Sequence, residues 1–207
     1  HAGSFDTTYL TTLPNFIVMA ASDEAELVRM INTSTEINDR PCAFRYPRGT
    51  GLGSTLPSIN EKIEIGKSKI IKEGKKLAIL NFGARLNETL KAAENLLKKG
   101  VPITVVDARF AKPLDENLIW QLATTHEAIM TIEEGSIGGF GSHVVNFLTK
   151  KGLMDSNLKF RSLTLPDIFI DQDTPDKMYK VANLDSVSIE EKVLDLLNSN
   201  IVLKKQN

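Results

Sequence analysis

The first residues of the chain bring together three types that could take part in chemistry: His1, Gly3 and Asp6. Imidazole titrates near pH ~6.5, so a positioned His1 could accept and donate a proton during one reaction cycle. Gly3 would let the backbone bend close to a ligand, and Asp6 could orient the loop. Taken alone, however, these residues favour an ordinary histidine at a chain end.

Two arginines, Arg45 and Arg48, flank Tyr46 and Pro47 further along the chain. Guanidinium is a planar fork that meets phosphate oxygens in pairs, and a loop just beyond a strand is a good place to present it. The simpler alternative is a surface ion pair with Asp39 or a neighbouring carboxylate, which contributes little stability. From the residues alone, the surface ion pair is the favoured interpretation.

A cluster of glycines between a predicted strand and a predicted helix invites comparison with phosphate-binding loops; it comprises Gly135, Gly138, Gly139 and Gly141. The dinucleotide-binding fingerprint fails because Val144 stands where a further glycine is needed. Glu133 and Glu134 precede the loop and would repel a phosphate. We therefore favour a tight turn that brings backbones together, for instance at a subunit interface. The acidic pair is expected to be interfacial rather than catalytic.

The remaining composition argues against several classes of protein. The 207 residues carry 25 Lys and Arg against 26 Asp and Glu, mixed along the chain, so we expect no nucleic-acid interface. No apolar run reaches membrane-spanning length. The single Cys42 argues against a disulfide framework and favours a reducing compartment. His126 and His143 lack the spacing of metal ligands and are expected to be structural, so no metal site is predicted.

The elements that would position the two arginines follow from local patterns. Residues 15–19 predict a strand, followed by a helix that Ser22 or Asp23 caps, with Glu26 completing a capping box. A second strand is predicted at 42–46, where Pro47 ends it. Turn-forming residues from 51 indicate a linker over 51–74, in which 62–71 could add an edge strand.

Beyond the linker, apolar strands alternate with helical segments. The predicted strands are 76–82, 101–106, 128–132 and 158–165, and the predicted helices are 87–99, 114–123, 142–151, 176–181 and 189–197. In the first of these helices Leu90, Ala93 and Leu97 form the expected inner stripe. Such alternation implies parallel strands joined by right-handed crossovers. Residues 75–207 should therefore form a three-layer α/β domain with a mainly parallel sheet.

Five segments carry a resemblance to a known family: 1–6, 13–14, 19–24, 44–49 and 133–142. In this order they resemble 1-deoxy-D-xylulose-5-phosphate synthase, a thiamine-diphosphate enzyme of the transketolase kind. The similarity extends over essentially the whole chain and corresponds to the C-terminal portion of a longer protein. One departure is Thr50, where the family has a carboxylate or Asn; it affects no role assigned here.

The resemblance implies a fold and a reaction. Residues 1–50 would be the end of a thiamine-diphosphate pyrimidine-binding domain, and 75–207 a complete transketolase C-terminal-type domain. The enzyme would condense pyruvate, with loss of CO₂, with glyceraldehyde 3-phosphate. By similarity, His1 would be catalytic and transfer protons, and Arg48 would bind the substrate phosphate. Arg45 is a second substrate-binding candidate or a structural neighbour.

The resemblance also implies what lies outside this chain. Thiamine diphosphate and Mg²⁺ would be held upstream, because their usual Gly-Asp-Gly signature is not found in these residues. We therefore expect the isolated chain to be inactive and to need the missing N-terminal part and a second copy as homodimer partner. The expected compartment is a bacterial cytoplasm or the plastid stroma. Alternatives are transketolase, a 2-oxo-acid dehydrogenase β subunit, or a non-catalytic dimerisation module.

Overall fold

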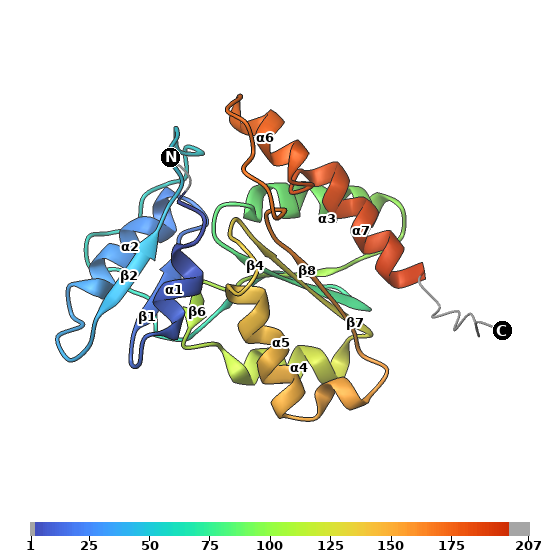
Figure 1. Cartoon of the computed structure of the whole chain (residues 1–207), viewed down its shortest axis with the longest axis horizontal. Coiled ribbons are helices and arrows are strands. Elements are labelled where there is room, and N and C mark those ends of the chain that lie inside the picture. The colour runs from blue at the N-terminus through green and yellow to red at the C-terminus, as the bar shows by residue number, and fades with distance from the viewer. Residues whose placement is uncertain (1–2, 199–207) are drawn as a thin grey trace.

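The computed structural model describes residues 3–198, which form two β-sheets with helices around them (Figure 1). The first sheet has the strand order β2-β1-β6 and the second sheet the order β3-β5-β4-β7-β8. The strands of the first sheet are β1 (Ile17–Ala20), β2 (Cys42–Arg45) and β6 (Phe110–Lys112). Those of the second sheet are β3 (Lys69–Lys72), β4 (Leu77–Phe82), β5 (Thr104–Asp107), β7 (Ala128–Glu133) and β8 (Lys159–Leu163).

The second sheet is the centre of a three-layer arrangement, as the sequence predicts. Helices α4 (Glu116–Thr125) and α5 (Phe140–Lys150) cover one face, and α3 (Leu86–Lys98) and α7 (Ser186–Asn198) cover the other. Strands β5, β4, β7 and β8 are parallel, whereas β3 pairs antiparallel with β5 at the edge. The predicted α/β fold with a mainly parallel sheet is therefore confirmed.

Strand β4 shows why these strands read as continuous apolar runs. Its side chains alternate between the two faces of the sheet, and both faces are covered by helices. Leu80 and Phe82 pack in the core under α4 and α5, while Leu77 and Ile79 pack under α3 and α7. Every residue of β4 is buried, so no polar alternation remains in the sequence.

The first sheet draws on two distant parts of the chain. Strand β1 pairs in parallel with β2 and antiparallel with β6, which follows β5 and lies far along the sequence. Helix α1 (Asp6–Thr12) packs beside this sheet, and α2 (Glu24–Ser34) connects β1 to β2. Neither α1 nor β6 was predicted from the sequence. Two shorter helical elements, η1 (Leu153–Asp155) and α6 (Pro175–Val181), complete the described chain.

Two local predictions need correction. Asp23 caps α2 by accepting the Glu26 N–H at 2.8 Å, but the Glu26 carboxylate does not complete the box. It pairs with Arg29 and Arg109 instead. In α3 the predicted inner stripe is correct at Ala93, which is buried, but Leu96 is fully buried whereas Leu97 is 49% exposed.

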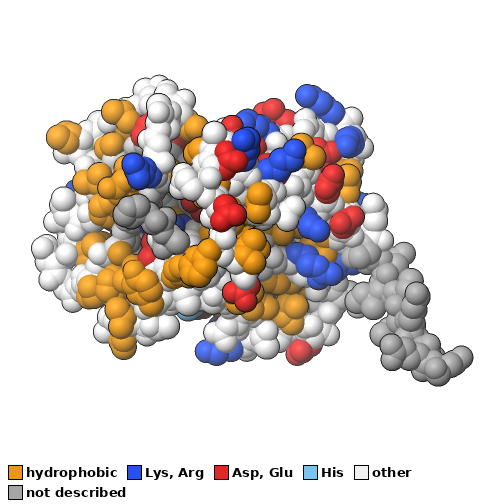
Figure 2. Space-filling model, turned by 45° about the horizontal axis from the view of Figure 1, so that its top comes forward, with side chains coloured by type: hydrophobic (Ala, Val, Ile, Leu, Met, Phe, Trp, Pro, Cys, Tyr) orange, Lys and Arg blue, Asp and Glu red, His pale blue; other side chains and the backbone are white. Residues whose placement is uncertain are grey.

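On the face of the molecule shown in Figure 2, the two halves differ in their surface. Figure 2 shows charged side chains concentrated over the half that holds the second sheet, whereas the first-sheet half presents mostly hydrophobic and uncharged groups. Exposed apolar residues of the first-sheet half include Tyr9, Leu13, Ile31 and Tyr46. No helix within residues 3–198 combines the length and apolar composition needed to cross a bilayer.

Candidate functional site

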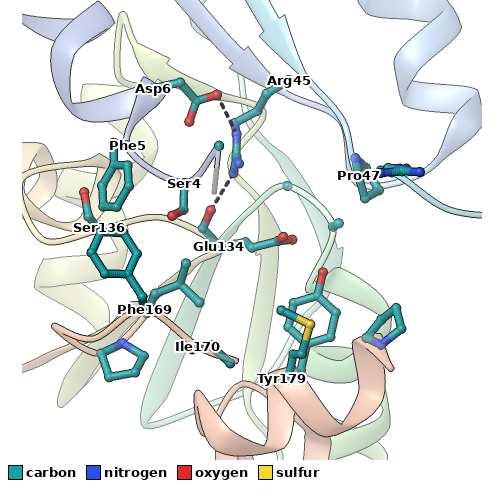
Figure 3. Close-up of a pocket in the computed structure, with 18 of the residues that line it drawn as sticks. Ser4, Phe5, Asp6, Arg45, Pro47, Glu134, Ser136, Phe169, Ile170 and Tyr179 are labelled. Atoms are coloured by element: carbon teal, nitrogen blue, oxygen red, sulfur yellow. Dashed lines mark hydrogen bonds and ion pairs between the residues drawn. The ribbon is translucent and has the colours of Figure 1, made fainter. Parts of the chain in front are cut away.

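A cavity of about 1000 Å³ lies where the two sheets meet (Figure 3). Apart from residues 3–6, its lining comes from residues at or beyond the carboxyl ends of β1, β2, β4, β7 and β8. Parallel α/β sheets bind ligands outside the carboxyl ends of their strands, so this is the expected place for a site. Four segments that carry the family resemblance reach the cavity: residues 3–6, 20–21, 45–48 and residues within 134–137.

Arg45, the last residue of β2, is engaged by protein groups. Its Nε donates to Asp6 Oδ2 at 3.0 Å, and its Nη1 donates to the backbone oxygen of Glu134 at 2.6 Å. Its side chain is 22% exposed. Arg45 therefore lies in the cavity wall and connects the start of the chain to the loop after β7 (Figure 3).

Arg48 lines the same cavity but is exposed and differs from Arg45 in its surroundings. Within residues 3–198 no hydrogen bond or ion pair of its guanidinium is found, and Asp39 pairs with its neighbour Arg40 instead. The loop beyond Arg48 is fixed by Glu24, whose carboxylate accepts the backbone N–H groups of residues 52–54. The structure therefore presents an available cation from a loop held at both ends.

His1 lies outside the described residues, so its catalytic role stays a prediction. Gly3 and Ser4, close to it in sequence, line the cavity together with Arg45 and Arg48. The other two histidines lie elsewhere. His126 Nε2 is 2.8 Å from Thr104 Oγ1, and burial lowers the pKa of both His126 and His143.

The glycine-rich turn after β7 folds around the side chain of Glu133, so no bound phosphate is needed to account for it. Its buried carboxylate accepts the N–H groups of Phe140 and Gly141, both at 2.9 Å, at the start of α5. Burial raises the pKa of this carboxyl group, and the two N–H groups act in the opposite direction. A Cβ atom on Gly139 would collide with the same carboxylate. The predicted tight turn is therefore present, built around an acidic side chain within the chain.

The far wall of the cavity was not identified from the sequence. It consists of residues 165–172 after β8 and of Met178 and Tyr179 in α6. The Arg85 guanidinium lies 3.4 Å from the centroid of the Tyr179 ring. Burial, together with the charge of Glu134, raises the pKa of Tyr179 to about 12. The rule that ligands bind beyond parallel strand ends could have indicated these residues, since they follow predicted strand 158–165.

The described residues do not provide a site for a metal-bound diphosphate. Across residues 3–198, no three His, Cys, Asp or Glu side chains lie close enough to hold a metal ion. The cavity wall also contains the acidic residues Asp6, Glu134, Asp167 and Asp171, which would repel a diphosphate without a cation.

Comparisons with known proteins agree with this architecture. Residues 66–189 match the family described as transketolase, C-terminal domain. A solved structure described as "Split gene transketolase, inactive beta4 tetramer" superposes with a TM-score of 0.80 at 27% sequence identity. The alignment covers 93% of this chain but 61% of that chain, so this chain spans about three fifths of its length. The predicted transketolase-type kinship is thus confirmed, and the chain belongs to the family of transketolase C-terminal domains.

Proposed function

We propose that this chain is the C-terminal part of a thiamine-diphosphate-dependent transferase, 1-deoxy-D-xylulose-5-phosphate synthase. The complete enzyme breaks the bond between the carboxylate and keto carbons of pyruvate, releases CO₂, and joins the remaining two carbons to the aldehyde of glyceraldehyde 3-phosphate. One observation carries this proposal: the segments 3–6, 45–48 and 134–137, which bear the resemblance, contribute to one cavity at the strand ends.

Arg48 is proposed to bind the phosphate of the aldehyde substrate. Its guanidinium is exposed at the cavity and has no protein partner within residues 3–198. A planar cation without an internal partner suits a phosphate, which can accept two parallel hydrogen bonds from it. His1 is proposed to transfer protons near the reacting carbon; the nearby Ser4 lines the same cavity.

The rest of the site is proposed to lie outside this chain. Thiamine diphosphate with Mg²⁺ would supply the carbanion chemistry from an upstream part of the protein, in a bacterial cytoplasm or plastid stroma. We retain the division into a remnant of the pyrimidine-binding domain (1–50), a linker (51–74) and a C-terminal domain (75–207). Strand β2 has a neighbour on one side only among the described strands, which supports further strands from elsewhere.

Assembly with a second copy is also part of the proposal. The first-sheet half exposes Tyr9, Leu13 and Tyr46. On the face shown in Figure 2, this half presents mostly hydrophobic and uncharged groups, and exposed apolar patches are typical of regions that pack against another protein part. A homodimer that includes the upstream part would cover such a surface.

A subunit of a split transketolase is the second candidate. It is favoured by the solved structure of that description, which matches 93% of this chain. The two candidates differ in the donor substrate. A synthase takes two carbons from pyruvate and releases CO₂, whereas a transketolase transfers two carbons from a ketose phosphate.

The test uses the complete gene product with thiamine diphosphate and Mg²⁺. Pyruvate and glyceraldehyde 3-phosphate should give CO₂ and 1-deoxy-D-xylulose 5-phosphate in equal amounts. The isolated 207-residue chain should give neither product. Turnover by the isolated chain, or activity only with a ketose phosphate donor, would refute the proposal. In the second case the transketolase candidate would replace it.

A further inference from the structure

The start of the described chain is attached to the loop after β7 by several separate contacts. The Ser4 backbone oxygen accepts the Ser136 N–H at 3.0 Å, and the hydroxyl groups of Thr8 and Ser136 lie 3.2 Å apart. The rings of Phe5 and Phe169 meet edge to face with centroids 6.4 Å apart. In Figure 3 these groups lie along one side of the cavity. Residues 4–8 are therefore held by parts of the chain more than a hundred residues away.

Arg45 is the charged centre of this attachment. Its guanidinium donates to Asp6 in α1 and to the Glu134 backbone oxygen, bridging the two segments (Figure 3). The base of the side chain is fixed because the Arg45 backbone oxygen accepts the Ala21 N–H at 3.0 Å, which continues the pairing of β1 and β2. We call the set Asp6, Arg45, Glu134, Ser4 and Ser136 the clasp.

The clasp depends on the positive charge of the Arg45 guanidinium. Asp6 Oδ1 is buried and has no hydrogen-bond partner among residues 3–198, so within this part of the chain the Asp6 charge relies on Arg45 at its other oxygen. The buried carboxylate of Glu133 also feels both charges: Arg45 favours its ionised form and Asp6 opposes it. Without Arg45, two neighbouring carboxylates would repel each other across the boundary between α1 and the β7 loop.

We infer that Arg45 is a positioning residue of the proposed reaction and not a second phosphate ligand. This inference rests on the proposed function. Ser4 is three residues from His1, a distance that an extended chain covers in roughly 10 Å. Fixing Ser4 and Asp6 therefore positions a segment that lines the same cavity as Arg48 and that closely follows His1 in the sequence. Nε and Nη1 of Arg45 already donate to Asp6 and Glu134, so Arg45 has fewer donors left for a phosphate than Arg48 has.

The test compares Arg45→Gln, Arg45→Lys and Asp6→Asn in the complete enzyme. Misplacing a catalytic group by about 1 Å costs roughly 100-fold, so Arg45→Gln should lower kcat by about 10- to 100-fold. Its KM for glyceraldehyde 3-phosphate should change less than about 2-fold, because no phosphate contact is lost. Arg45→Lys should recover part of kcat, since an ammonium can still reach Asp6. The double variant Asp6→Asn, Arg45→Gln should be no slower than the poorer single variant.

Hydrogen exchange of the Ser136 amide, which donates to Ser4, gives a readout that does not depend on activity. This exchange should become faster in Arg45→Gln and in Asp6→Asn. The matched control is Arg40→Gln, which removes an exposed arginine paired with Asp39 and should leave the exchange unchanged. If the complete protein forms no 1-deoxy-D-xylulose 5-phosphate, the proposed function fails while this exchange measurement still decides on the clasp. A raised KM for glyceraldehyde 3-phosphate with unchanged kcat, or unchanged Ser136 exchange in the folded variants, would overturn the inference.

Discussion

Asp107 is a buried carboxylate at the junction of the two sheets, and replacing it with Asn should change how stability depends on pH. It is 1% exposed at the end of β5. Its Oδ2 accepts the Ser22 hydroxyl at 2.6 Å and its Oδ1 accepts the Arg109 N–H at 3.2 Å. Burial raises the pKa of Asp107 to about 7, and the nearby Glu26 adds to this against the opposing effects of Ser22 and Arg109.

The direction in which stability changes with pH follows from the pKa of Asp107 in the folded and unfolded states. The pKa of Asp107 is about 7 in the fold and 3.8 in the unfolded chain, so the folded state keeps this proton to higher pH. Stability is therefore lost progressively as pH rises from about 4 to about 7. The difference between these pKa values corresponds to at most about 4 kcal/mol, an order-of-magnitude figure. The side-chain oxygen of an Asn at this position can still accept the Arg109 N–H, and its NH₂ group can donate to the Ser22 hydroxyl oxygen. Unlike Asp, it cannot ionise.

The assay is urea unfolding of the wild type and Asp107→Asn between about pH 4.5 and pH 8.5. Subtracting the two unfolding free energies at each pH removes the titration of all other groups. The variant should gain stability relative to the wild type as pH rises, by a few kcal/mol in total. Asp39→Asn serves as a control, since Asp39 is exposed and its pKa is lowered by the neighbouring Arg40. A difference between Asp107→Asn and wild type that stays constant with pH would refute this reasoning.

Two further predictions concern packing and are read by the same unfolding assay. Phe82→Ala should cost about 3–5 kcal/mol, because Phe82 is fully buried and stacks on Phe140 with ring centroids 5.1 Å apart; a loss near zero would contradict the assigned core. Gly74→Ala should cost about 1–3 kcal/mol or more, because a Cβ there would overlap the backbone of Ile103. Gly49→Ala is the matched control, since its Cβ would meet open space; equal losses in both variants would contradict the steric argument.

The buried strands of the second sheet and two strands of the first sheet, β1 and β2, could be predicted from sequence, whereas β6 could not. Strand β7 (Ala128–Glu133) is buried along its whole length and is apolar except for Thr131 and the final Glu133, and burial on both faces favours such a sequence. Strand β6 has three residues and joins the first sheet only through pairing with β1, so no local pattern marks it. In α3 the predicted stripe placed Leu97 inside, because helical spacing alone does not distinguish it from Leu96.

Only part of the site was predicted from the sequence, and the part that was not predicted depends on contacts between distant residues. Arg45 and Arg48 were identified by resemblance, and both line the cavity. Their different surroundings depend on contacts that sequence spacing does not encode. Arg45 meets Asp6 and Glu134 across 39 and 89 residues, respectively, and Glu26 leaves its expected capping role because Arg109 approaches it from 83 residues away. Contacts between residues far apart in the sequence therefore decide that Arg45 is held by protein groups whereas Arg48 is exposed at the cavity, and local sequence patterns do not encode this difference.

The central claim is that Arg48 binds the phosphate of the acceptor aldehyde. The most direct measurement compares kcat/KM for glyceraldehyde 3-phosphate with kcat/KM for unphosphorylated glyceraldehyde, with pyruvate as donor, in wild type and Arg48→Ala. Loss of charge-assisted hydrogen bonds worth about 1.5–3 kcal/mol should reduce the preference for the phosphorylated acceptor by roughly 10- to 100-fold. Arg40→Ala, on the surface beside Asp39, should leave the preference unchanged. A preference that survives intact in Arg48→Ala would contradict the account.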